Sequence, residues 1–218
     1  VAWGRYVIAM RVADHARALA YMEKLIQNGE ASAQAFENRA NLHRLLGQYD
    51  KAAADVETGL AKSPGLTSLR FIRAHILADQ NQWTAAQTEV DAILRTEPSA
   101  RNLTSAGLFY ESYRRGKEAF DAYNRAIALN TDNAELYLHR HRFRPLNDID
   151  GRAADIDKAA STAPNNPLVL QAQADLLAIQ GDPAGAIKIY STALTKHPDM
   201  VALRHGRGLV YAKAGGMA

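Results

Sequence analysis

The residues best suited to chemistry lie in one short basic segment in the second half of the chain. Positions 139–144 read His-Arg-His-Arg-Phe-Arg, and Pro145 follows directly. Guanidinium and imidazole groups this close together could bind phosphate or carboxylate groups of a partner. The same residues also fit a distorted, solvated helix that ends at the proline. The sequence leaves both interpretations open, and the solvated helix is the favoured one.

Neither a metal site nor a catalytic site is predicted. His139 and His141 are two residues apart, whereas two ligands on one helix face need a separation of three or four. The chain has no cysteine, which excludes disulfides, thiolate zinc sites and a cysteine nucleophile. The remaining histidines belong to no recognisable catalytic motif, and no glycine-rich phosphate loop is present. We therefore expect no enzyme activity, no metal and no cofactor.

The composition is that of a folded, soluble protein. Of 218 residues, 47% are hydrophobic, 7% aromatic and 22% charged, and the net charge of +3 is dispersed along the chain. A dispersed basic excess does not by itself indicate nucleic-acid binding. No apolar run approaches the ~20 residues that cross a bilayer, so no membrane span is expected. The alanine- and arginine-rich composition suggests a bacterial source, which would leave the cytoplasm and the periplasm open as locations.

The elements that must position these side chains recur about every 34 residues. The period is marked by Pro64, Pro98, Pro164 and Pro198, with Thr131 where a fifth marker would fall. Twelve residues before most markers lie Ala52, Ala86, Ala119 and Ala186, with Ala153 one residue closer to its proline and Ala18 one period before Ala52. Apolar residues at helical spacing follow each alanine, which predicts the second helix of a two-helix unit.

A first helix is predicted before each of these alanines. Its small residues, twelve positions upstream, are Ala40, Ala74, Gly107 and Ala174. A small residue is needed because a bulky side chain would push two closely crossing helices apart. In the basic segment the register is open. With Tyr137 as the first apolar anchor, His141 occupies the small position; with Leu136 and Phe143 as anchors, Arg140 occupies it.

Two stretches resemble tetratricopeptide repeats closely enough to name the family. They carry Phe36, Ala40, Gly47, Tyr49, Ala52, Val56, Leu60 and Pro64 in one case, and Leu103, Gly107, Tyr110, Ala119, Tyr123 and Ala126 in the other. The resemblance extends over nearly the whole chain as about five to six degenerate repeats. It implies an all-α fold, a right-handed α-solenoid of antiparallel helix-turn-helix repeats.

The period divides the chain into seven segments. We expect a partial or irregular repeat over 1–30, full repeats over 31–64, 65–98 and 99–132, a degenerate repeat over 133–165, a further repeat over 166–199, and the first helix of a truncated repeat over 200–218. The first helix of the degenerate repeat should end by Arg144, because Pro145 follows. Since the last repeat lacks a second helix and the chain begins with Val1, we expect a fragment of a longer protein, or self-association through the uncapped repeat.

The resemblance implies that first helices line a groove that holds another protein or peptide. By analogy with the family, the partner-binding residues are Asn38, Asn41, Phe71, His75, Arg101, Leu108, His139, Arg142, Gln171 and Asp175. A clamp for a C-terminal carboxylate is not expected, because Ser68 and Ile72 stand where the clamp needs basic residues. One alternative is an accessory repeat domain of a larger enzyme or transport machine. Another is nucleic-acid binding through the helix at 139–144, which the lack of a stacked aromatic row disfavours.

Overall fold

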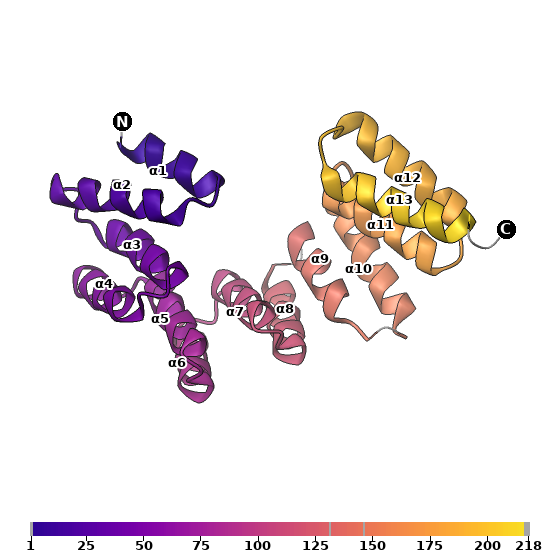
Figure 1. Ribbon diagram of the computed structural model, residues 1–218. Coiled ribbons are helices and arrows are strands. Elements are labelled where there is room, and N and C mark those ends of the chain that lie inside the picture. The colour runs from indigo at the N-terminus through magenta and orange to yellow at the C-terminus, as the bar shows by residue number, and fades with distance from the viewer. Residues whose placement is uncertain (1, 131, 146, 216–218) are drawn as a thin grey trace. The chain divides into compact units, whose positions relative to one another are not determined.

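The chain is built from helical hairpins (Figure 1). The computed structural model describes residues 2–130, 132–145 and 147–215, so the predicted marker Thr131 lies outside the described residues. Thirteen helices and no strand are present in the described part. This arrangement confirms the predicted all-α fold of antiparallel helix-turn-helix units. None of these helices has the length and apolar character to span a bilayer.

The helix bounds follow the predicted period. The helices are α1 (Ala2–Arg11), α2 (His15–Gln27), α3 (Ala33–Leu45), α4 (Tyr49–Lys62), α5 (Thr67–Asp79), α6 (Trp83–Thr96), α7 (Ala100–Ser112), α8 (Gly116–Leu129), α9 (Ala134–Phe143), α10 (Ile149–Thr162), α11 (Pro167–Ile179), α12 (Pro183–Lys196) and α13 (Val201–Gly215). Each of the four prolines that mark the period lies two residues after a second helix, because proline cannot continue one.

Two compact units divide the chain, Val1–Phe109 and Tyr110–Ala218. In the first, α1 packs on α2, α3 on α4, and α5 on α6; in the second, α9 packs on α10 and α11 on α12. Each unit has its own buried core. In the first unit Val56 and Leu69 belong to it, and in the second Tyr190 and Leu203 do.

Local sequence explains where the helices begin and turn. The Ser32 hydroxyl accepts a hydrogen bond from the Ala35 N–H at 3.1 Å, and the Asp182 carboxylate accepts one from the Gly185 N–H at 2.8 Å, so both are N-caps. The turn inside a hairpin requires a left-handed residue. Gly47 and Gly181 supply it, with φ of 71° and 85°, at no steric cost.

Small residues allow the two helices of a hairpin to cross closely. The eighth residues of α3, α5, α7 and α11 are Ala40, Ala74, Gly107 and Ala174, and the fourth residues of α4, α6, α8 and α12 are Ala52, Ala86, Ala119 and Ala186. All seven alanines are fully buried, with 0% exposure. The predicted packing role of these residues is therefore confirmed.

The hairpin of α9 and α10 departs from this pattern. The helix α9 has 10 residues where α3, α5, α7 and α11 have 13, and it ends at Phe143, as Pro145 predicts. Its bounds make His141 the eighth residue, which decides the register in favour of the Tyr137 anchor. In α10 the fourth residue is Arg152, so Ala153 does not occupy the place of the marker alanine.

Candidate partner-binding site

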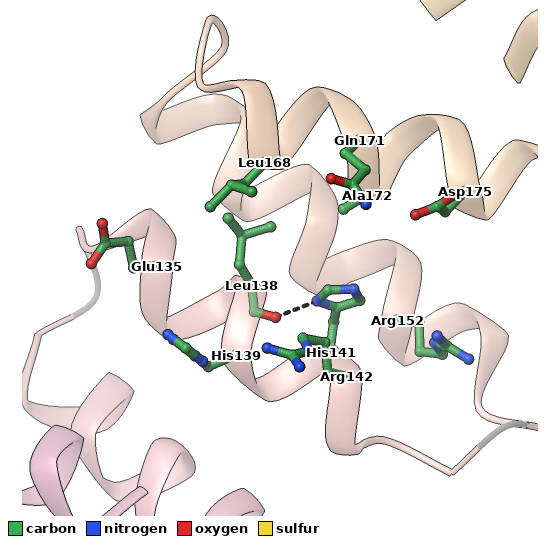
Figure 2. A pocket seen from close by; sticks show the side chains of 10 residues that line it. All are labelled: Glu135, Leu138, His139, His141, Arg142, Arg152, Leu168, Gln171, Ala172 and Asp175. Carbon is green, nitrogen blue, oxygen red and sulfur yellow. Dashed lines mark hydrogen bonds between the residues drawn. The ribbon is translucent and has the colours of Figure 1, made fainter. Parts of the chain in front are cut away.

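A hollow of about 600 Å³ lies among α9, α10 and α11 in the C-terminal unit. Its lining residues, drawn in Figure 2, are Glu135, Leu138, His139, His141, Arg142, Arg152, Leu168, Gln171, Ala172 and Asp175. Four of the residues predicted from the sequence meet here. They are His139, Arg142, Gln171 and Asp175.

The hollow is formed by equivalent faces of two successive first helices. Its lining uses the second, fifth, sixth and ninth residues of both helices, which are Glu135, Leu138, His139 and Arg142 in α9 and Leu168, Gln171, Ala172 and Asp175 in α11. Such spacing puts side chains on one face of a helix. The two helices also contact each other, so the two faces lie next to one another.

The carboxylate of Glu111 fixes one edge of the hollow. Its Oε2 atom accepts hydrogen bonds from the Tyr123 hydroxyl at 2.9 Å and from His139 Nδ1 at 3.0 Å, and its Oε1 atom lies 2.8 Å from Arg142 Nη1. The rings of Tyr123 and His139 stack with centroids 5.0 Å apart. Burial, and then the bond to Glu111, raises the pKa of Tyr123. His139 and Arg142 are therefore held in place before any partner arrives.

A second tyrosine holds the opposite edge in the same way. The buried Tyr190 of α12 donates its hydroxyl hydrogen to Asp175 Oδ1. Burial, and then this bond, raises the pKa of Tyr190. The Asp175 side chain is thereby oriented on α11, next to the partly exposed Gln171.

His141 of α9 and Arg152 of α10 lie where these two helices cross, and both line the hollow. His141 Nδ1 lies 2.5 Å from the carbonyl oxygen of Leu138, and because a carbonyl only accepts, Nδ1 must carry the hydrogen. Burial is the largest cause of the lowered pKa of His141, and the nearby Arg152 and Arg142 add to it. With the hydrogen on Nδ1, the Nε2 atom of the neutral ring is an acceptor.

A family profile described as Tetratricopeptide repeat matches residues 7–66 and 172–218. The chain is a tetratricopeptide-repeat protein. The repeat hairpins of this family are the units found here. No curated protein matches the sequence.

Solved structures similar to this repeat protein share its fold at low sequence identity. Yeast Tom70 has a TM-score of 0.80 and 14% identity over 98% of this chain, which spans only 47% of Tom70. A tetratricopeptide repeat protein from Parabacteroides merdae has a TM-score of 0.63 and 18% identity, covering 94% of this chain and 81% of that one. YrrB, described as having an unusual peptide-binding site, has a TM-score of 0.55 and 16% identity, covering 86% of this chain and 97% of YrrB.

The other six predicted residues of the repeat array lie in the N-terminal unit. Asn41 accepts hydrogen bonds from Arg44, which also binds Asp79 at 2.8 Å. The ring of His75 packs edge-on against Phe109, and burial is the main cause that lowers its pKa to about 4.

The remaining four differ in exposure. Phe71 is buried at 7% exposure, so little of its side chain is open to a partner, whereas Leu108 is 43% exposed and Arg101 is exposed. Asn38 lines a separate hollow of about 550 Å³ beside Trp3. In the N-terminal unit the predicted residues therefore do not gather in one hollow.

Two arginines of the basic segment have a structural role that was not predicted. The carboxylate of Asp155, 1% exposed, accepts hydrogen bonds from Arg140 Nε at 3.1 Å and from Arg144 Nε at 2.6 Å. In α3 and α4 the same helix positions hold Arg39 and Asp55, with Arg39 Nε 2.8 Å from Asp55 Oδ2. The recurrence of Arg and Asp at equivalent positions is the signal that would have revealed these pairs.

Proposed function

We propose that this repeat array binds an extended segment of a partner protein, with the hollow among α9, α10 and α11 as a contact site. The supporting observation is that equivalent faces of two successive first helices line one hollow. The hollow offers apolar surface from Leu138 and Leu168 together with hydrogen-bonding groups from Gln171 and Arg142. A polypeptide presents both kinds of group at short, regular intervals, so it can use both.

Preorganisation favours binding at this place. Glu111 and Tyr190 already hold His139, Arg142 and Asp175 in their positions, so a partner would not have to order these three side chains. Leu168, by contrast, is 50% exposed, and burying it would contribute to affinity through the hydrophobic effect. YrrB has the same fold and is described as having a peptide-binding site, which supports a peptide ligand here as well.

The test uses a displayed library of random twelve-residue peptides selected against the full chain. The affinity of the best peptide is then measured by fluorescence anisotropy for the wild type and two double variants. Leu168→Ala with Gln171→Ala removes groove groups, and we expect about a tenfold loss of affinity, which corresponds to ~1.4 kcal/mol. Lys188→Ala with Thr192→Ala changes two exposed residues of the second helix α12 and should leave affinity unchanged. The proposal fails if only the second pair weakens binding.

A further inference from the structure

The α9–α10 hairpin carries two polar side chains where the other full hairpins carry small residues. The eighth residue of a first helix and the fourth of a second helix are Ala or Gly in α3–α4, α5–α6, α7–α8 and α11–α12. In α9–α10 they are His141 and Arg152, and both line the hollow. The crossing that Ala or Gly occupies in the other full hairpins therefore holds an imidazole and a guanidinium group here.

The guanidinium groups at this hollow retain unused hydrogen-bond donors. The Arg152 side chain, partly buried, forms no hydrogen bond or ion pair with any residue that the structure describes. Arg142 has one ion pair, through Nη1 to Glu111, and its side chain is 57% exposed. A guanidinium has five N–H donors in a planar arrangement that fits a carboxylate. Partial burial of a guanidinium without a partner costs free energy, because the group loses contact with water.

His141 lies between these two arginines among the residues drawn in Figure 2. Its Nδ1–H is used by the Leu138 carbonyl, which leaves Nε2 as an acceptor. That atom suits a donor such as a peptide N–H. The apolar side chains of Leu138, Leu168 and Ala172 also line the hollow. Cationic groups, a hydrogen-bond acceptor and apolar side chains thus lie within one site.

The carboxylates around the hollow limit how much negative charge it accepts. Glu135 and Asp175 belong to its lining and are exposed, and Asp155 lies behind it, bound to Arg140 and Arg144. A ligand with two negative charges, or a run of acidic residues, would meet repulsion from these groups. One carboxylate of single charge suits the unpaired guanidinium group of Arg152.

We propose that the α9–α10 hairpin recognises one aspartate or glutamate side chain of the partner, with an aliphatic residue next to it. The inference rests on the proposed function and names the chemistry of the ligand. Arg152 binds the carboxylate, Nε2 of His141 accepts a backbone N–H, and the aliphatic side chain packs on Leu138 and Leu168. This places the specificity for the acidic residue in His141 and Arg152, which replace Ala or Gly of the other full hairpins.

The test takes the best peptide of the library and makes three matched forms, with glutamate, glutamine or phosphoserine at the acidic position. Against the full wild-type chain we expect a single acidic residue in the selected sequences, and about tenfold weaker binding of both the glutamine and the phosphoserine forms. The variant Arg152→Ala should weaken the glutamate form about tenfold and leave the glutamine form unchanged. That variant restores the residue found in the other second helices, so it should fold, as circular dichroism will verify.

The matched control is Arg125→Ala, which removes an exposed arginine from the second helix α8. This variant should bind the glutamate form and the glutamine form of the peptide as tightly as the wild type does. The inference is overturned if no acidic residue is enriched, if phosphoserine binds as well as glutamate, or if Arg152→Ala weakens both forms equally. In any of these three cases the proposed function still stands if the selected peptides bind the double variant Leu168→Ala with Gln171→Ala more weakly than the wild type. When no peptide is enriched at all, both proposals fail.

Discussion

At the scale of single residues, the ion pairs inside the hairpins determine which arginine side chains remain available to a ligand. Asp155 is buried and accepts hydrogen bonds from both Arg140 and Arg144, and Arg144 also lies 2.7 Å from Asp148. These bonds raise the pKa of Arg144, with the contact to Asp155 as the largest cause. A buried pair of this kind stabilises little compared with an apolar contact, yet removal of one partner leaves an uncompensated charge.

The replacement Asp155→Asn is therefore expected to lower the free energy of unfolding by about 3 kcal/mol. Urea denaturation followed by circular dichroism measures the change. The control is Asp157→Asn, which makes the same chemical change at an exposed position of α10 and should cost less than about 0.5 kcal/mol. Equal values for the two variants would contradict a structural role for the Asp155 pairs.

These pairs also show where sequence reasoning about the site was incomplete. His139 and Arg142 line the hollow, because helical spacing puts them on one face of α9. That they bind a partner stays a prediction. The roles of Arg140 and Arg144 were not predicted, because their counter-charge lies on the following helix, where spacing within one helix gives no information. Arg152 was missed because the neighbouring Ala153 matched the expected residue type.

At the scale of elements, the helices could be predicted because two kinds of marker share one period. Each proline lies just outside a helix, and the alanines lie where helices cross. The register of α9 could not be predicted, since Leu136 and Tyr137 are both apolar and both buried, at 1% and 6% exposure. What fixes its start is the cap, in which the Asn133 side chain accepts a hydrogen bond from the Glu135 N–H.

The fourth position of the second helices offers a test of this reading of the hairpins. Ala186→Leu in α12 should lower the free energy of unfolding by ~1–3 kcal/mol, because a larger side chain overpacks a fully buried crossing. Arg152→Leu puts the same residue at the same position of α10, where the hollow leaves room, and should change stability by less than about 0.5 kcal/mol. Chemical denaturation of both variants in parallel gives the comparison. A similar cost at both positions would mean that the α9–α10 crossing is as tightly closed as the others.

At the scale of the whole molecule, function follows from what the repeats expose rather than from the fold alone. The fold is shared with proteins as different in length as Tom70 and YrrB. The chain spans 47% of Tom70, and an accessory role within a larger enzyme or transport machine stays a prediction. A net charge of +3 over 218 residues is small, so the state of each cationic group matters more than their number.

The last prediction concerns nucleic acid, the other ligand that the basic segment suggested. Nonspecific binding needs several cations that can exchange counterions for phosphates, and its affinity falls steeply with salt. In this segment Arg140 and Arg144 are bound to Asp155, and Arg142 and His139 are bound to Glu111. We therefore expect a labelled 20-nucleotide single strand to bind the full chain more weakly than ~10⁻⁴ M at about 0.1 M salt, measured by fluorescence anisotropy. Micromolar binding that falls steeply with salt and is lost with Arg142→Ala would show that the ion pairs open, and that the basic segment binds phosphate.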